Sequence, residues 1–293
     1  MLKLSLIFTP MQAYLDIALR AALEAGREIL RIYTDPASDF QVERKADNSP
    51  LTIADRTAHE VIMRHLQETP FPVLSEEGRH DSYELRRSWK TFWCVDPLDG
   101  SKEFIKQNGM FSVNIALVVE GVPTLGVVFF PAAGTVAGAT IRTMREPESH
   151  SLPQTAGLLY WTDGTVSRRA LVDDCSDVYE IETLPVQAEQ TGRPYTVVAS
   201  ASHMSEETEA YIDALRAEHP DLRLVQAGSS LKICRVAEGS ADIYPRLGLT
   251  SEWDTAAGHA VARAAGFDIV SHEDGLTLRY NKPDILNPFF IVK

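Results

Sequence analysis

One segment constrains the fold of this chain more than any other: an apolar stretch that ends in closely spaced aspartates. The residues before Asp96 are mostly aromatic or apolar and predict a buried strand. Pro97 follows, and because proline has no N–H for strand pairing, we expect the strand to end there. Asp99 then precedes Gly100 and Ser101. The sequence therefore predicts a sharp turn at the end of a core strand.

This turn has two interpretations. It would bring the carboxylates of Asp96 and Asp99 to one point, with the Leu98 carbonyl between them, and Mg²⁺ prefers hard oxygen ligands of this kind. Gly100 and Ser101 would then offer small side chains and free N–H groups to a phosphate. The same residues also fit an ordinary Asx-Pro turn with an Asp-Gly corner. The segment alone does not separate these alternatives.

Two other segments place carboxylates in similar settings. A short apolar strand runs into Glu76 and Glu77, and because adjacent side chains point in different directions, we expect only one of them to face a shared site. A solvated acidic loop is the alternative. Asp254 stands where a helix of small residues begins, either as the N-cap or as a ligand from the second half of the chain. His259 on that helix is expected to pack or hydrogen-bond.

Apolar spacing predicts the elements along the chain. Helices are expected at residues 11–33, 52–67, 205–217, 229–238 and 254–265. Strands are expected at residues 71–74, 91–95, 112–119, 124–130, 196–199, 222–225 and 241–244.

These patterns predict two domains. Residues 1–140 should form an α+β domain with two helices and a mostly antiparallel sheet. Residues 141–293 should form an α/β domain, because short strands alternate with helices from residue 195, as in βαβ units. Residues 141–194 show little periodicity and are expected to be an irregular insertion, and the first ten residues a start-site extension or a loose arm.

Charge and cysteine content exclude several classes. A formal net charge of −13 argues against a nucleic-acid-binding surface. The three cysteines are far apart, so a zinc site or a disulfide framework is not expected, and a reducing cytosol fits. No apolar run reaches the roughly 18 residues that a membrane-spanning helix requires. Peripheral attachment to the inner face of the membrane stays open.

Three motifs together carry a family resemblance. The strings LSEE (74–77), DPLDGS (96–101) and WDTAAG (253–258) resemble those of the inositol monophosphatase superfamily of lithium-sensitive phosphatases. The resemblance runs from about Ala13 to the C-terminus, apart from much of residues 141–194. Within the superfamily, the bacterial 3′(2′),5′-bisphosphate nucleotidase branch is nearest, through KADNSP (45–50), KEFIK (102–106), GSSLK (228–232) and YPR (244–246). This implies a layered αβαβα sugar-phosphatase fold.

The resemblance implies a metal site and a catalytic pair. Two or three Mg²⁺ ions would be held by Glu76, Asp96, Asp99, Asp254 and the Leu98 carbonyl. Asp55 and Ser101 would form a carboxylate–hydroxyl pair that, with Glu76, orients or deprotonates the attacking water. Family members usually carry threonine where this chain has Ser101. Serine keeps the hydroxyl and loses the methyl group that restricts its rotamer.

Further residues are candidate substrate contacts. Ser229 and Lys232 would hold a second phosphate at the start of a helix, whose free N–H groups attract anions. Arg246 would bind a phosphate or stack on a base. By resemblance, His203 would contact the nucleotide, and the substrate set also includes Gly100, Ser101 and Asp254. Each has an ordinary structural alternative, such as a helix cap, a surface charge or a salt-bridged turn.

The implied activity is Mg²⁺-dependent phosphomonoester hydrolysis by a metal-activated water. Adenosine 3′,5′-bisphosphate, a by-product of sulfate assimilation, would give AMP and phosphate, with 3′-phosphoadenylyl sulfate as a second substrate. The alternatives are an inositol-1-phosphate phosphatase, a sugar bisphosphatase, or an inactive nucleotide-binding regulatory protein. A small nucleotide is the only partner expected, with no nucleic acid and no stable partner protein, in the cytoplasm.

Overall fold

The computed structural model describes residues 10–38, 40–44, 50–79, 81–133, 157–186, 192–200 and 204–293. The helices are α1 (Pro10–Tyr33), α2 (Ile53–Leu66), α3 (Tyr83–Arg86), α4 (Ser101–Ile105), α6 (Glu206–Glu218), α7 (Leu231–Ala237) and α8 (Glu252–Ala264). The strands of the first part are β1 (Glu43–Arg44), β2 (Pro50–Leu51), β3 (Val73–Ser75), β4 (Thr91–Asp99), β5 (Ser112–Val119), β6 (Val122–Phe130), β7 (Gly157–Thr162), β8 (Ser167–Asp173) and β9 (Asp177–Thr183). The remaining strands are β10 (Thr196–Ser200), β11 (Arg223–Ala227), β12 (Tyr244–Arg246), β13 (Ile269–Ser271) and β14 (Phe290–Val292).

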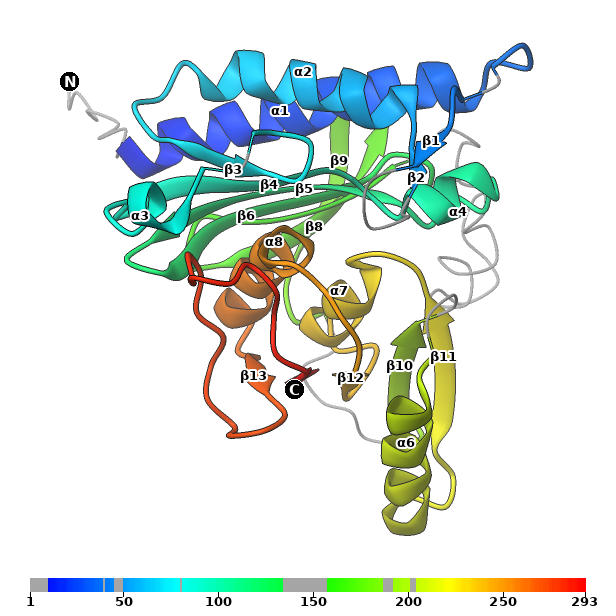
Figure 1. The fold of residues 1–293 in the computed structure, drawn as a ribbon. Coiled ribbons are helices and arrows are strands. Elements are labelled where there is room, and N and C mark those ends of the chain that lie inside the picture. The colour runs from blue at the N-terminus through cyan, green and yellow to red at the C-terminus, as the bar shows by residue number, and fades with distance from the viewer. Residues whose placement is uncertain are drawn as a thin grey trace, which may run out of the picture.

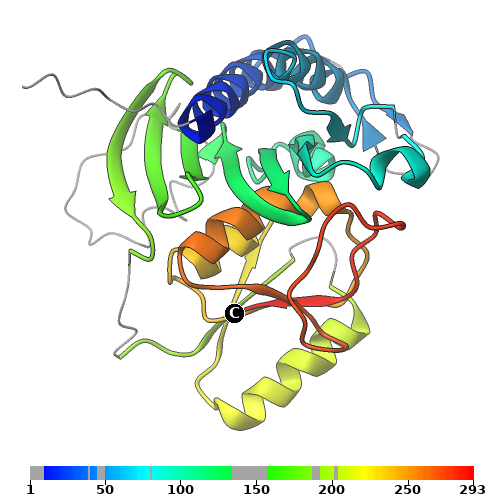
Figure 2. The same cartoon turned by 90° about the vertical axis from the view of Figure 1, so that its left-hand side faces the viewer.

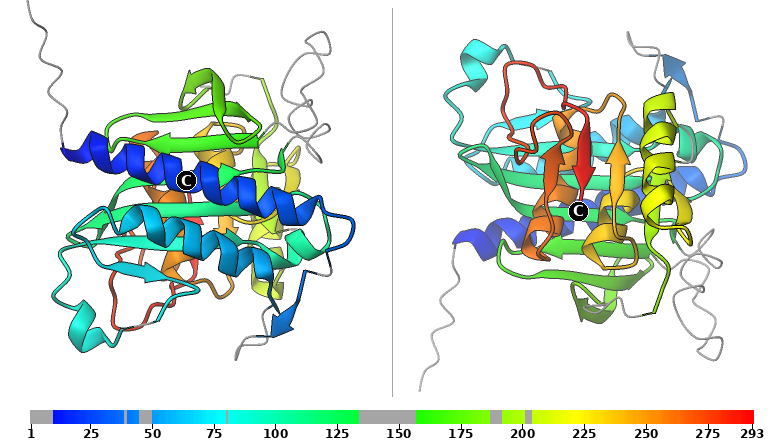
Figure 3. Two further views of the ribbon diagram at one scale, coloured as in Figure 1. Left: turned by 90° about the horizontal axis from the view of Figure 1, so that it is seen from above. Right: turned by 90° about the horizontal axis from the view of Figure 1, so that it is seen from below.

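The elements stack in five layers. Helices α1 and α2 cover one face of a large sheet, and α7 and α8 cover the other (Figure 1). The strands β10–β14 lie beneath α7 and α8, and α6 lies outside them (Figures 2 and 3). This is the layered αβαβα arrangement that the resemblance implied, and the expected fold is confirmed.

Strand β4 shows why the large sheet needs helices on both sides. Its side chains alternate, so that Phe92 and Cys94 join the core shared with α7 and α8, whereas Trp93 and Val95 join the core beneath α1 and α2. A strand that is buried on both faces reads as a continuous apolar run, which is the pattern seen in the sequence.

The large sheet extends further along the chain than expected. Its order is β3-β4-β5-β6-β7-β8-β9, and all neighbours are antiparallel except the parallel pair β3 and β4. The expectation of an irregular insertion is therefore wrong for residues 157–183, which form three strands of this sheet. Residues 141–156 lie outside the described part of the chain. The division into two domains after residue 140 stays a prediction.

The second half contains one βαβ unit and a small antiparallel sheet. Strands β10 and β11 are parallel and are joined through α6, as the alternating pattern predicted. Strands β12, β14 and β13 pair antiparallel in that order, and a parallel bridge from Val197 to Ile243 connects them to β10. The expected strand at residues 241–244 lies later, at Tyr244–Arg246, and β13 and β14 were not predicted.

The cysteines and the helices agree with the expectations drawn from composition. All three cysteines are buried and free, as small apolar core residues would be. Among the helices described, none combines the length and the apolarity needed to cross a bilayer.

Candidate metal and phosphate site

A β-bulge places the two aspartates of the DPLDGS motif on one face of the sheet. Strand β4 continues to Asp99, so the expectation that it ends at Pro97 is wrong. Asp96 pairs with Asn114 and Asp99 pairs with Ser112, which gives β4 one extra residue between the pairs. Paired residues project to the same face, as do residues two apart on β5. Without the bulge, Asp96 and Asp99 would point to opposite faces.

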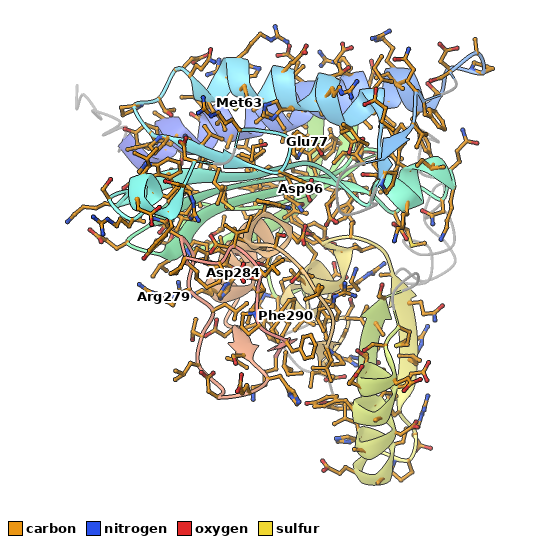
Figure 4. All side chains as sticks on the ribbon, in the orientation of Figure 1. Met63, Glu77, Asp96, Arg279, Asp284 and Phe290 are labelled. Atoms are coloured by element: carbon orange, nitrogen blue, oxygen red, sulfur yellow. The ribbon has the colours of Figure 1, made fainter. Side chains whose placement is uncertain are left out.

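Asp254 completes a group of three carboxylates. Asp96, Asp99 and Asp254 each contribute one carboxylate oxygen, and these three oxygens lie within 4.8 Å of one another. Glu76 lines the same cleft next to Asp96, whereas the carboxylate of Glu77 lies near enough to Asp55 to raise the pKa of that residue. Figure 4 shows Glu77 on the side of Asp96 that is nearer α2. Leu98 buries its side chain and still lines the cleft, so its backbone faces the site.

The Asx turn expected for the DPLDGS segment is present, and it is compatible with a role of Asp96 in the acidic group. Asp96 Oδ1 accepts a hydrogen bond from Leu98 N at 3.0 Å, which is the contact of an Asx turn. The same carboxylate belongs to the acidic group. The local bond fixes its orientation, and the turn is therefore the means by which the carboxylate is positioned.

Asp55 and Asp254 occupy equivalent positions in two helices. Each is the third residue of its helix and closes a capping box, Asp55 with Thr52 and Asp254 with Ser251. The interpretation of Asp254 as the N-cap itself is therefore wrong, because Ser251 has that position. Asp254 Oδ2 accepts from Ser251 N at 2.7 Å, which leaves Oδ1 for a cation. The capping box thus fixes a carboxylate at the start of each helix.

The predicted carboxylate–hydroxyl pair is present. The Ser101 hydroxyl donates to Asp55 Oδ1 at 2.9 Å, and Thr52 N donates to Asp55 Oδ2 at 2.7 Å. Asp55 is only 1% exposed, and burial raises its pKa, although the bonds from Thr52 and Ser101 oppose that rise. Gly100 precedes the pair at a φ of 97°, and a Cβ there would lie 3.2 Å from the Met110 carbonyl oxygen. Glycine is therefore required at this corner.

Two site residues were missed by the sequence analysis. Ser230 donates to Asp99 Oδ2 at 3.0 Å and lies 3.1 Å from the Asp254 carbonyl oxygen. Asn114 Nδ2 lies 2.9 Å from Ser230 Oγ and 3.3 Å from Asp99 Oδ2. Ser230 thus connects Asp99, from the first half of the chain, with Asp254, from the second half. Asn114 is a polar residue inside the buried strand β5, where only Ser112 is also polar, and that signal would have identified it.

The predicted phosphate-binding residues lie in the same cleft, which has a volume of about 620 Å³. Lys232 is 6% exposed, and its ammonium donates to the Ser229 carbonyl oxygen and lies 5.5 Å from the Tyr244 ring centre. Helix α7 begins at Leu231, so Ser229 does not cap it and instead has a φ of 42°. Arg246 Nη2 donates to the Leu249 carbonyl oxygen at 3.0 Å.

Some predicted residues cannot be placed. His203 and residues 45–49 of the KADNSP string lie outside the described residues.

His259 is buried on α8, where Nδ1 lies 2.9 Å from the Tyr280 hydroxyl and Nε2 lies 2.7 Å from Asp268 Oδ1. It therefore hydrogen-bonds within the structure, as expected.

Burial and mutual repulsion shift the pKa values of the acidic group and of Lys232. Burial, together with the carboxylates of Glu76, Asp99 and Asp254, raises the pKa of Asp96 well above its ordinary value. Burial and the carboxylates of Asp99 and Glu76 raise the pKa of Asp254 to about 8. Burial lowers the pKa of Lys232 to about 8, although the nearby Asp99 opposes that change. A buried group of carboxylates repels itself unless cations bind. All-oxygen donors suit Mg²⁺, and the residues therefore fit a divalent metal site.

The raised pKa of Asp254 predicts a pH dependence of stability in metal-free protein. A folded-state pKa of about 8, against an ordinary 3.8, means that folding takes up a proton between these values. Stability should therefore fall as pH rises from about 5 to about 8, by up to about 1.4 kcal/mol per pH unit for this one group. Urea unfolding in chelator should show a fall of this sign, and Asp254→Asn should make the slope less steep by the share of this one carboxylate. Equal slopes in the two proteins would contradict the prediction.

Comparisons with known proteins extend over nearly the whole chain. The profile of the inositol monophosphatase family matches residues 11–288. The 3′(2′),5′-bisphosphate nucleotidase CysQ of Salmonella typhimurium is 41% identical over 281 residues, which are 95% of this chain and 98% of that protein. The CysQ of Escherichia coli K12 matches with the same identity and coverage.

Solved structures show the same relationship. The crystal structure of CysQ from Bacteroides thetaiotaomicron, a bacterial member of the inositol monophosphatase family, superposes with a TM-score of 0.80 at 46% identity. The superposition covers 96% of this chain and 97% of that one. The IMPase of Thermotoga maritima superposes with a TM-score of 0.67 at 18% identity, over 96% and 92% of the two chains, and supports the fold alone.

Proposed function

We propose that this chain, which belongs to the inositol monophosphatase family, is a Mg²⁺-dependent 3′(2′),5′-bisphosphate nucleotidase. The family membership confirms the resemblance drawn from the three sequence motifs. The proposed reaction converts adenosine 3′,5′-bisphosphate to AMP and phosphate, with 3′-phosphoadenylyl sulfate as a second substrate. The observation that carries the proposal is the meeting of Asp96, Asp99 and Asp254 in one cleft with Lys232 and Arg246.

We propose two or three Mg²⁺ ions at the acidic group. Asp96, Asp99, Asp254, Glu76 and the Leu98 carbonyl are the proposed ligands. When bound, the ions neutralise the phosphoryl charge and lower the pKa of water. The protein's contribution is to fix the carboxylates in advance, through the bulge of β4 and the capping box of α8.

Asp55 and Ser101 are the proposed pair that positions and deprotonates the attacking water. Ser101 Oγ donates its proton to Asp55 Oδ1, so its lone pairs remain to accept a proton from water. The raised pKa of Asp55 makes it a better proton acceptor at neutral pH. Because Thr52 holds the other Asp55 oxygen, the pair is oriented before substrate binds.

The two phosphates and the base of the substrate have separate partners in the cleft. One phosphate lies at the carboxylate group, and Lys232 and Ser229 hold the other. The base needs an apolar surface, and Leu249 lines the cleft while 71% exposed. Arg246 Nη2 holds the Leu249 carbonyl and so fixes that surface. This favours a nucleotide over inositol 1-phosphate, which has neither a base nor a second phosphate.

Lys232→Met should weaken bisphosphate hydrolysis selectively. Loss of a charged hydrogen bond to the second phosphate should lower kcat/KM for adenosine 3′,5′-bisphosphate by about 10- to 100-fold. Any hydrolysis of inositol 1-phosphate should change little, because this ester lacks the second phosphate. Lys90→Met, at an exposed lysine that pairs with Glu120, is the control. Equal losses on both substrates would show that Lys232 acts on the metal ligands instead.

A substrate panel tests the proposed function. Phosphate release with Mg²⁺ should be compared for adenosine 3′,5′-bisphosphate, inositol 1-phosphate and fructose 1,6-bisphosphate. We expect the highest kcat/KM for the nucleotide. Faster turnover of the inositol ester would assign the chain to the inositol phosphatases. Release from none of the three would favour a nucleotide-binding protein without catalysis.

A further inference from the structure

The segment Tyr280–Asn287 follows β13 and lies against the first turn of α8, the turn that carries Asp254. Glu252, fully buried in that turn, accepts hydrogen bonds from Asn281 N at 2.7 Å and from Lys282 N at 2.9 Å. The ammonium of Lys282 also donates to Glu252, at 2.7 Å. The beginning of this segment is thus bound to the residue two positions before Asp254.

The end of the same segment binds the other side of that turn. Asn287 Nδ2 donates to the Ser251 carbonyl oxygen at 2.7 Å and to Thr255 Oγ1 at 3.1 Å. The Tyr280 hydroxyl lies 3.2 Å from the same Thr255 oxygen and 2.9 Å from His259 Nδ1. Polar contacts therefore flank Asp254 on both sides, at Ser251 and at Thr255.

The segment is also attached to the first half of the chain, which supplies Glu76, Asp96 and Asp99. The buried Arg86 of α3 donates to Asn281 Oδ1 at 2.9 Å and to the Lys282 carbonyl oxygen at 3.2 Å. Asn281 Nδ2 donates back to the Arg86 carbonyl oxygen at 2.7 Å. Tyr280 N donates to the Gly121 carbonyl oxygen, in the β5–β6 turn, at 3.1 Å. Figure 4 labels Asp284 within this segment and Arg279 just before it.

Helix α8 is also held against the large sheet, by close packing and by a hydrogen bond of 2.6 Å from Ser167 Oγ of β8 to the Val261 carbonyl oxygen. The face of α8 toward the sheet carries alanines and Val261. At Gly126 of β6 the contact is so close that a Cβ would lie 2.4 Å from the Ala257 carbonyl oxygen. This close packing fixes how near α8 lies to the sheet. The hydrogen bonds of Tyr280–Asn287 add directional constraints at the first turn of α8, the turn that carries Asp254.

We infer that the segment Tyr280–Asn287 is a positioning element for the metal site: it sets Asp254 relative to Asp96 and Asp99. Arg86, Asn281 and Asn287 are positioning residues that touch neither metal nor substrate. This inference rests on the proposed metal site. Partners that orient metal ligands typically change metal affinity by about 10- to 100-fold when removed. The expected effect is therefore on Mg²⁺ affinity rather than on chemistry.

The test measures Mg²⁺ binding without substrate, as the shift of the unfolding temperature with Mg²⁺ concentration. Asn287→Ala should raise the half-saturating Mg²⁺ concentration by about tenfold. Tyr280→Phe, a milder change, should raise it less, and Arg86→Gln should raise it although Arg86 contacts neither α8 nor the acidic group. In assays of phosphate release, kcat at saturating Mg²⁺ should stay near the wild-type value.

Tyr160→Phe is the matched control for Tyr280→Phe. Tyr160 is also fully buried, and its hydroxyl donates to Glu238 Oε2 at 2.7 Å, outside the cleft. Both changes remove one buried hydroxyl, so both should lower thermal stability, and only Tyr280→Phe should shift Mg²⁺ half-saturation. If Tyr280→Phe, Asn287→Ala and Arg86→Gln lose stability with unchanged half-saturation, the inference is wrong. If the wild-type protein shows no Mg²⁺-dependent shift, the proposed metal site is wrong and the inference fails with it.

Discussion

Asp96→Asn should nearly abolish phosphate release and, at the same time, make the metal-free protein more stable than wild type. Asp96 is 1% exposed, and burial with three neighbouring carboxylates opposes its ionisation. A neutral amide of the same shape removes that repulsion and should stabilise the metal-free fold by about 1–3 kcal/mol. It also removes a proposed metal ligand, and loss of several kcal/mol of transition-state stabilisation corresponds to about a 10³-fold lower kcat.

Asp96→Asn should thus lower the activity and raise the metal-free stability, and general misfolding would lower both. Urea unfolding in chelator and in Mg²⁺ gives the two stabilities, and phosphate release gives the activity. The wild-type protein should gain stability from Mg²⁺, and Asp96→Asn should gain little. Asp213→Asn, at an exposed aspartate of α6 that pairs with Arg216, is the control and should change neither quantity. An Asp96→Asn protein that is active and responds to Mg²⁺ as wild type does would place the metal elsewhere.

Much of the fold follows from local sequence patterns. Helices α1 and α2 have clear apolar periodicity, and the capping box of α2 is visible as a threonine three residues before an aspartate. The β5–β6 hairpin has two mostly apolar strands around Glu120-Gly121, where both residues take positive φ. In contrast, β9 was missed because it is mostly exposed and lacks a regular apolar pattern. Strand β7 was missed although it is buried along its whole length, because a short apolar run has no period that separates a strand from a helix. Strands β13 and β14 span three residues each, too few to show a period.

The site was predicted as a set of residues, and its geometry was not. Sequence strings indicated Asp96, Asp99 and Asp254, but spacing alone puts Asp96 and Asp99 on opposite faces of a regular strand. The bulge that brings them together depends on pairing with β5, a contact between segments. Ser230 was missed for the same reason, because its bond to Asp99 joins residues that are 131 positions apart. Local rules identify chemical groups, whereas tertiary pairing decides which of them meet.

Ser101→Ala should lower kcat by about 10²- to 10³-fold with little change in Mg²⁺ affinity. The Ser101 hydroxyl bonds to Asp55 Oδ1, and no other hydroxyl is bonded to that oxygen within the part of the chain that the structure describes. Removing the relay between water and Asp55 removes general-base assistance, which typically contributes about 10²- to 10⁴-fold. Ser101 does not bind the metals through its side chain in the proposed mechanism, so the Mg²⁺-dependent shift of the unfolding temperature should persist.

Ser101→Thr is the matched variant, and it separates a catalytic pair from a structural one. Threonine restores the hydroxyl and restricts its rotamer, so kcat should equal or exceed that of wild type. The Asp55 bond also ties the first residue of α4 to the first turn of α2, and a purely structural role would follow from that tie alone. In that case Ser101→Ala would lower the unfolding temperature and leave kcat near wild type. A large loss of kcat at an almost unchanged unfolding temperature, recovered by threonine, therefore identifies the hydroxyl as part of the reaction.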